Sequence, residues 1–306
     1  MALNIQIPVR THEDFGHSLS KLLRLLSQLC TTAERHIILD FNQARMLNPF
    51  FLGGLACAIR HYEKNGKFFE LNYQQNFNIN SYLDTIFFPV CHTPETGGEE
   101  VFMHTLEKFR AKNYIPIIAF PTGIDTGVTA IREKVLSAVS SILRKQLNFT
   151  EKNLMPIAYI IDEMTHNIND HSFADTGFVF AQYYPASNYI DICICDYGIG
   201  ILQSYQKSQK FHPENEREAI EFAINGRSTK DRPESKGFGI STSRDMLVNG
   251  LKGKFFLLSG NTAYIQTTEN KGIIDIPDNF FYQGNYVALR VPTLIDPAFN
   301  LYNYVE

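Results

Sequence analysis

The stretch 160-IIDEMTHNINDHS-172 combines the apolar spacing of a helix with a dense group of polar side chains. At the helical period, its apolar residues and one that precedes it fall on a single narrow stripe, which predicts a helix that packs on a sheet. The residues of this stripe are Ile157, Ile161, Met164 and Ile168.

A second, polar stripe runs along the same predicted helix. Glu163, Asn167 and His171 follow one another at intervals of four residues, and Asp170 joins Glu163 two turns on. This stripe lies beside the apolar one, so we expect these side chains at the edge of the core, where a cleft would be. The residues predicted for the outer face are Asp162, Thr165 and Asn169.

Three interpretations of the polar stripe compete. The plainest is a partly solvated face of an ordinary helix. A second is a carboxylate-bridged di-metal site, because Glu163 and His166 have Glu-x-x-His spacing, but no second copy of that pair occurs in the chain. The third is a nucleotide site, in which the Asn167 oxygen binds Mg²⁺ and Glu163 accepts a proton from the group that attacks the terminal phosphate.

Two glycine motifs downstream favour the nucleotide interpretation. "DYGIGI" (196–201) directly follows the apolar stretch "YIDICIC", and "KGFGIS" (236–241) opens a predicted helix. Asp196 at a strand end can accept a hydrogen bond from an exocyclic amine such as that of adenine. Glycine lets a ligand approach the backbone closely, and amides at the start of the helix after Gly239 can hold phosphate oxygens.

The order of these three motifs resembles the GHKL ATPase superfamily with its Bergerat nucleotide fold, over residues 113–306. The spacing around Glu163 is most similar to that of the anti-sigma-factor serine kinases. The resemblance implies an α/β sandwich ATPase domain that binds ATP and Mg²⁺, with the segment 225–237 as its lid. Asn285 stands where the family usually has Thr. The implied roles are general base for Glu163, Mg²⁺ ligand for Asn167, adenine contact for Asp196, pocket wall for Gly198 and Gly200, and phosphate cradle for Gly237 and Gly239.

The front of the chain, residues 1–112, alternates strand-like and helix-like segments in the order β-α-β-α-β-α, which predicts a small sheet with helical crossovers. Residues 36–73 resemble the STAS domain of anti-sigma-factor antagonists, with Gly53 and Gly54 on its helix. The usual phosphoacceptor is missing, since no Ser or Thr lies between Phe41 and Arg60. The resemblance implies a surface for docking or for a homodimer. Residues 113–306 are predicted as a second, α+β domain with a mainly antiparallel sheet.

Composition narrows the function classes. The chain has 306 residues and a net charge of −4 without a dense basic run, so no nucleic-acid partner is expected. No signal peptide or membrane span is apparent, and the five cysteines are expected to be reduced thiols of a cytoplasmic protein. Within the remaining classes, the resemblance to the GHKL superfamily implies a regulatory ATPase or protein serine/threonine kinase that acts on a partner protein. The alternative is a partner-switching module that is gated by ATP and does not hydrolyse it.

Overall fold

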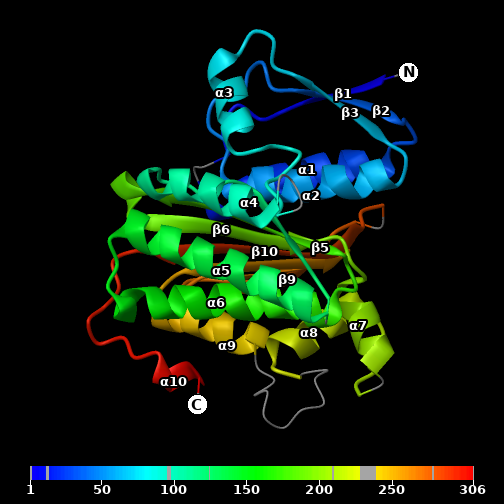
Figure 1. Ribbon diagram of the computed structural model, residues 1–306. Helices are drawn as coiled ribbons and strands as arrows, with labels where there is room; N and C mark the ends of the chain where they lie inside the picture. The colour runs from blue at the N-terminus through cyan, green and yellow to red at the C-terminus, as the bar shows by residue number, and fades with distance from the viewer. Residues whose placement is uncertain are drawn as a thin grey trace.

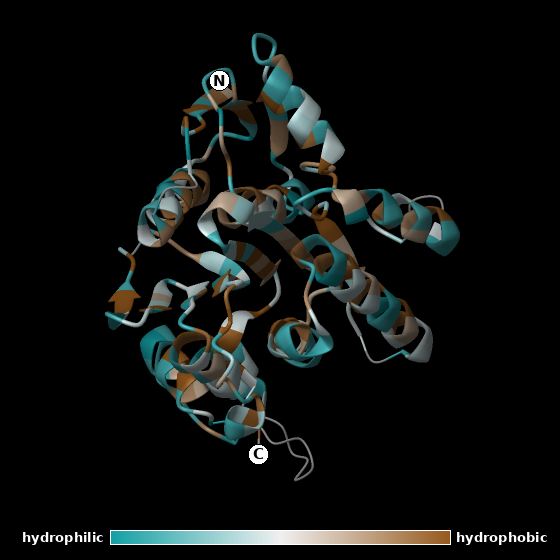
Figure 2. Ribbon diagram, turned by 90° about the vertical axis from the view of Figure 1, so that its left-hand side faces the viewer, coloured by the Kyte–Doolittle hydropathy of each residue, from teal (hydrophilic) through white to brown (hydrophobic). Residues whose placement is uncertain are grey.

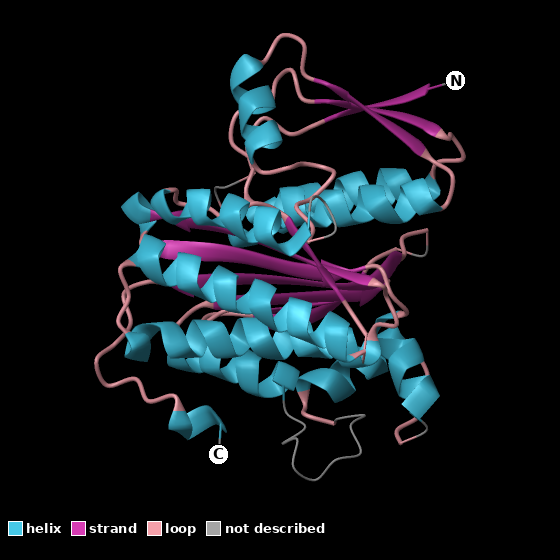
Figure 3. Ribbon diagram, viewed as in Figure 1, coloured by secondary structure: helices cyan, strands magenta, loops and turns pink. Residues whose placement is uncertain are grey.

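The computed structural model describes all residues except 1, 12–13, 95–97, 124, 209, 228–238, 278 and 306. Within the described residues, helices combine with a parallel three-stranded sheet and an antiparallel seven-stranded sheet (Figures 1 and 3). None of the helices in this part of the chain has both the length and the apolar character needed to cross a bilayer.

The three-stranded sheet confirms the β-α-β-α-β prediction for the front of the chain. Its strands pair in parallel in the order β1-β2-β3, and the helices α1 and α2 form the crossovers. Asp14 and Asn48 cap these helices by accepting hydrogen bonds from the backbone of His17 and Phe51. The elements are β1 (Ala2–Gln6), α1 (Phe15–Thr31), β2 (His36–Asp40), α2 (Pro49–Lys64), β3 (Phe68–Asn72) and the following α3 (Phe77–Thr85).

The seven-stranded sheet has the order β4-β5-β6-β10-β7-β8-β9, and all of its neighbouring strands run antiparallel. The mainly antiparallel sheet predicted for the second part of the chain is therefore confirmed. The strands are β4 (Ile118–Pro121), β5 (Thr176–Tyr184), β6 (Tyr189–Asp196), β7 (Lys254–Gly260), β8 (Thr262–Gln266), β9 (Lys271–Asp275) and β10 (Tyr282–Pro292).

Helices cover both faces of the seven-stranded sheet. The helices α1 and α2 lie between the two sheets, and α6 packs on the opposite face of the large sheet, beside α5 and α9 (Figure 1). The elements outside the front sheet are α4 (Gly98–Glu107), η1 (Lys108–Ala111), α5 (Thr126–Leu147), α6 (Glu151–His171), η2 (Pro185–Ser187), α7 (Gly200–Ser208), α8 (Glu216–Ile224), α9 (Gly239–Asp245), η3 (Met246–Gly250) and α10 (Tyr302–Val305).

Two adjacent glycines let α2 approach the large sheet closely. A β-carbon on Gly53 would lie 2.8 Å from Cys193 Sγ, and one on Gly54 would lie 2.8 Å from the ring of Tyr286. The Tyr286 hydroxyl donates to the carbonyl of Phe50 at 2.9 Å, which ties the start of α2 to β10. Hydrophobic residues follow the strands between the helical layers (Figure 2), and one continuous core joins both sheets.

A buried ion pair lies in the same layer between α2 and the large sheet. Arg290 donates to both carboxylate oxygens of Asp191 at 2.7 and 2.8 Å. Its guanidinium also stacks on Tyr189, 4.0 Å from the ring centroid. The pair thus supplies the hydrogen bonds that two charges need when they are removed from water.

Several features of the fold go beyond the sequence predictions. Residues 98–107 form α4, a helix between the two sheets' segments of the chain. The helices α7 and α8 and the strand β9 were missed, since each has nine residues or fewer and so carries only a short periodic signal. All five cysteines are free thiols, as expected. The division between residues 112 and 113 stays a prediction; α2 contacts strands of both sheets.

Candidate functional site

The helix α6 presents its apolar stripe to the large sheet, as the sequence predicts. Ile157, Ile161, Met164 and Ile168 are all at most 4% exposed. The helix contacts β5, β6 and β10, which places its neighbouring polar stripe beside the end of β6. The polar residues of the quoted stretch therefore lie at an edge of the core.

The predicted outer face of α6 is wrong for two of its three residues. Thr165 is fully buried and its hydroxyl donates to the carbonyl of Ile161 at 2.9 Å. Asn169 is half-buried, and its side-chain oxygen accepts hydrogen bonds from Gly123 at 2.8 Å and from Arg132. The reason is tertiary packing, because α5, which carries Arg132, lies along this side of α6. Asp162 is exposed, as expected.

The polar stripe of α6 meets the start of α9. Glu163 and Asn167 are both half-buried. A β-carbon on Gly239 would lie 2.5 Å from Glu163 Oε2 and 3.3 Å from Asn167 Nδ2, so only glycine fits here without displacing these groups. Asn167 Nδ2 is buried and has no hydrogen-bond partner among the described residues. The second glycine motif and the polar stripe, far apart in sequence, are thus brought together.

Tyr159, one turn before Glu163 on α6, adds a contact that the sequence reasoning missed. Burial, and then the nearby carboxylate of Glu163, raises the pKa of Tyr159 to about 12. The hydroxyl therefore stays protonated at neutral pH beside Glu163. The i, i+4 spacing of the two residues was the available signal.

Asp196 ends β6 and is fully buried. One of its carboxylate oxygens accepts a hydrogen bond from the Gly198 backbone at 2.7 Å, and the other accepts from the Asn285 side chain at 3.1 Å. Burial nevertheless raises the pKa of the Asp196 carboxyl to about 6. The Asn285 side-chain oxygen is buried and has no hydrogen-bond partner in the described part of the chain. Asn285 on β10 is therefore part of the surroundings of Asp196.

The first glycine motif forms a tight turn after Asp196. A β-carbon on Gly198 would overlap the carbonyl oxygen of Ser172, which accepts the Ile199 backbone N–H at 2.7 Å. Gly200 has a φ of +76°, a left-handed conformation that glycine adopts without strain, and it begins α7. Ser172 directly follows α6, so the turn is fastened to the end of the helix that carries Glu163 and Asn167.

Two clusters of predicted site residues result, both on the α6 side of the large sheet. Side chains alternate along β6: Cys193 and Cys195 point toward α2, so Asp196 points toward the opposite face of the sheet, where α6 packs. One cluster joins Glu163, Asn167 and Gly239; the other joins Asp196, Gly198 and Asn285, with Gly200 next to it. Gly237 and most of the predicted lid, with Lys230, Arg232 and Lys236, lie outside the described residues.

Metal binding in the described residues would depend on very few protein ligands. No group of three or more His, Cys, Asp or Glu side chains with metal-site geometry occurs among them. Glu163 and His166, which have Glu-x-x-His spacing, therefore belong to no such group in the described part of the chain. His166 instead pairs with Asp162, and this contact raises the pKa of its imidazole.

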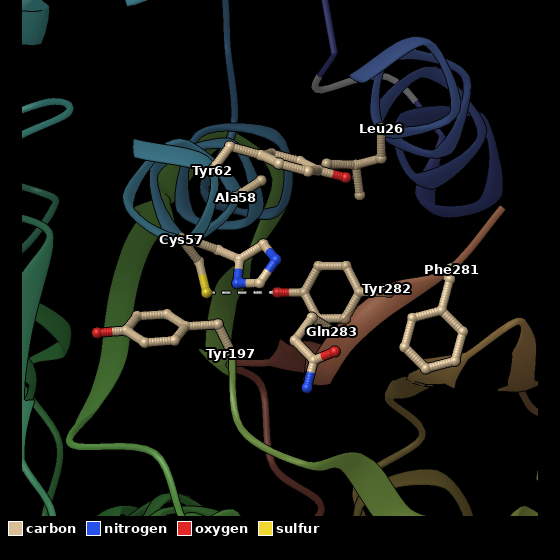
Figure 4. A pocket seen from close by; sticks show the side chains of 9 residues that line it. Leu26, Cys57, Ala58, Tyr62, Tyr197, Phe281, Tyr282 and Gln283 are labelled. Carbon is tan, nitrogen blue, oxygen red and sulfur yellow. Dashed lines mark hydrogen bonds between the residues drawn. The ribbon is translucent and has the colours of Figure 1, made fainter. Parts of the chain in front are cut away.

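A pocket lies on the other side of the loop that follows Asp196, between the helices α1 and α2 and the start of β10 (Figure 4). Cys57 and Ala58 of α2 line it together with Tyr197, Tyr282 and Gln283. The Gln283 side chain donates a hydrogen bond to the carbonyl of Gly198. The turn at Gly198 thus separates this pocket from the polar clusters.

Comparison of the sequence with models of known protein families gives no match. A comparison with curated proteins gives no match either.

Proposed function

We propose that this chain is an ATP- and Mg²⁺-binding protein of the GHKL type, with a Bergerat-fold nucleotide site on the α6 side of its large sheet. The observation that supports it most strongly is the meeting of Gly239 with Glu163 and Asn167. These residues come from separate motifs whose order in the sequence suggested one site, and a β-carbon on Gly239 would lie 2.5 Å from Glu163 Oε2.

The surroundings of Asp196 suit the amine of a purine base. The carboxylate has two further lone-pair positions beyond the hydrogen bonds that it accepts from Gly198 and Asn285. The side-chain oxygen of Asn285 adds a buried acceptor that lacks a partner among the described residues. An excess of acceptors favours a ligand that brings N–H donors, as the exocyclic amine of adenine does.

The residues near Gly239 suit a metal–phosphate group. A buried amide without a partner for its Nδ2 is costly unless a ligand or water completes it, which supports Asn167 as a binding residue. Its side-chain oxygen is the kind of hard ligand that Mg²⁺ accepts alongside phosphate and water. When bound, Mg²⁺ would neutralise phosphate charge.

Glu163 is the proposed general base. Its carboxylate would accept the proton of the attacking hydroxyl group as that oxygen bonds to the terminal phosphorus and the bond to ADP breaks. With water as the attacking group the chain is an ATPase, and with a serine or threonine hydroxyl of a partner it is a protein kinase. Both reactions use the same base.

The front of the chain is proposed to be STAS-like, supported by its parallel three-stranded sheet with α1 and α2 on one face. The start of α2, near which such domains carry their phosphoacceptor, is buried here. Phe50 and Phe51 are fully buried, and Tyr286 bonds to Phe50. We infer that this domain serves as a docked layer and that a partner protein, if phosphorylated, is a separate chain.

One contact favours the alternative of an ATP-gated module without hydrolysis. The protonated Tyr159 hydroxyl lies near the Glu163 carboxylate, and a nearby hydroxyl that stabilises the charged form of a carboxylate makes it a weaker base. If this contact restrains turnover, Tyr159→Phe increases phosphate release from ATP. If turnover stays undetectable in that variant with MgATP bound, the gated module is the better description.

Calorimetric titration with ATP, with and without Mg²⁺, tests the nucleotide site. We expect Mg²⁺ to strengthen ATP binding by the wild-type protein and to have little effect on Asn167→Ala. Asn153→Ala is the matched control, because Asn153 is a half-buried asparagine near the start of the same helix. An Asn167→Ala protein with the full magnesium effect would overturn the assignment.

A further inference from the structure

The last turn of α2 reaches the loop that carries the proposed adenine-binding residue. Lys64 Nζ donates to the hydroxyl of Tyr197 at 2.8 Å and to Asp175 Oδ2 at 2.7 Å. The Tyr197 hydroxyl donates to Asp175 Oδ1 at 2.7 Å, so the three groups form a closed triangle. The Lys64 ammonium also lies 4.7 Å from the centre of the Tyr197 ring. One lysine of the front domain thus joins two loops of the large-sheet domain.

Both of these loops are parts of the proposed nucleotide site. Tyr197 stands between Asp196 and Gly198, whose backbone N–H is bonded to the Asp196 carboxylate. Asp175 lies in the segment between α6 and β5, a few residues after Ser172, which accepts the Ile199 N–H. Anything that loosens the triangle of Lys64, Tyr197 and Asp175 therefore loosens the turn that aims the Asp196 carboxylate.

The geometry also shows that Lys64 acts from behind the site. Its helix lies on the face of the sheet toward which Cys195 points, whereas Asp196 points to the opposite face. Figure 4 shows Tyr197 and Gln283 on the α2 side of the loop, in the pocket that contains Cys57. Lys64 is therefore suited to hold the loop and is not aimed at a ligand near Asp196.

We propose that Lys64 of the front domain is a positioning residue for the nucleotide, acting through Tyr197 and Asp175 on the turn at Gly198. This inference rests on the proposed function for its effect on ATP, and it gives the front domain a direct role in nucleotide affinity. The ion pair is largely exposed, with Lys64 and Asp175 side chains 49% and 66% accessible. The expected effect of breaking it is therefore modest, about fivefold in Kd.

Full-length variants test the proposal by calorimetry with MgATP and by thermal unfolding. We expect Lys64→Met and Tyr197→Phe each to weaken MgATP about fivefold, to show less than additive effects when combined, and to leave Tm nearly unchanged. Lys64→Arg, which keeps a donor cation, restores most of the affinity. Lys134→Met is the matched control, because the Lys134–Glu99 pair is similarly exposed but belongs to α5 and α4. Wild-type affinity in Lys64→Met would overturn the proposal.

Hydrogen exchange without nucleotide separates this inference from the proposed function. The N–H groups of Gly198, Ile199 and Ile201 are bonded to Asp196, Ser172 and Ser259. We expect these amides to exchange about fivefold faster in Lys64→Met, with exchange in β7 and β8 unchanged. Unchanged exchange at the turn refutes the positioning role even if ATP binds. Faster exchange in a protein that does not bind ATP supports the loop contact and refutes only the nucleotide assignment.

Discussion

Replacing Asp196 by Asn should make the folded protein more stable while it weakens nucleotide binding. The carboxylate is fully buried and accepts hydrogen bonds from Gly198 and from Asn285. In Asp196→Asn the remaining oxygen can keep the bond from Gly198. The Asn285 amide can turn over, so that its oxygen, which has no partner among the described residues, accepts from the introduced amide.

The magnitude follows from the raised pKa of Asp196. The carboxyl ionises near 3.8 when exposed and at about 6 in the folded protein. The folded state therefore binds the proton more tightly, and the stability from this group is present at low pH and lost as the pH rises through about 6. Relative to low pH, this pKa difference destabilises the folded protein by about 1.5 kcal/mol at pH 5 and about 3 kcal/mol at pH 8. Asp196→Asn removes that cost, so its stabilising effect should grow with pH.

Urea unfolding at pH 5 and pH 8, with MgATP titration of the same proteins, measures both effects. We expect the stability difference between variant and wild type to increase by about 1.5 kcal/mol between the two pH values. MgATP affinity should fall about 10- to 100-fold with the loss of a charged hydrogen bond. Asp296→Asn is the control, because Asp296 makes the same type of backbone contact, to Ala298 at 2.8 Å, while exposed. A variant that is less stable at pH 8, or that binds MgATP normally, would refute the reasoning.

Three further predictions concern the same site. Glu163→Gln should lower phosphate release or transfer at least about 100-fold while MgATP Kd stays within about threefold; equal turnover excludes Glu163 as the base. Gly198→Ala should lower the free energy of unfolding in urea by about 3 kcal/mol or more, because its β-carbon would overlap Ser172. Gly272→Ala is the control, because a β-carbon there meets nothing within 4 Å, and equal stability of the two variants contradicts this account. MgATP affinity should fall about tenfold from pH 7.5 to pH 5 as Asp196 with its pKa of about 6 gains a proton, and Asp196→Asn should lack this component; parallel pH profiles would argue against it.

Local sequence patterns predicted most of the fold because apolar spacing and capping residues are local signals. The buried stripe of Ile157, Ile161, Met164 and Ile168 is an example. The misplaced face of α6 has a different cause: Thr165 is buried by α5, and no pattern within α6 records what packs beside it. The layer arrangement, with α1 and α2 shared by two sheets, was likewise not predicted.

The candidate site was predicted residue by residue, and its surroundings were not. Motif order suggested that Gly239 would lie near Glu163 and Asn167, and the structure brings these three together. The contacts from Asn285 and Lys64 depend on how separate elements meet in space. Lys64 in particular lies 133 residues before Tyr197, and no local spacing connects them. Gly237 is outside the described residues, so its predicted role stays a prediction.

The close packing of Gly53 and Gly54 against Cys193 and Tyr286 has a consequence for how the chain unfolds. A fragment excised at residue 113 would lose α1 and α2 and expose to solvent the side of β5, β6 and β10 that they cover, including Arg290 and its buried partner Asp191. The two halves therefore depend on each other for their solubility as well as their shape. Melting of the intact chain is expected to proceed as one cooperative transition.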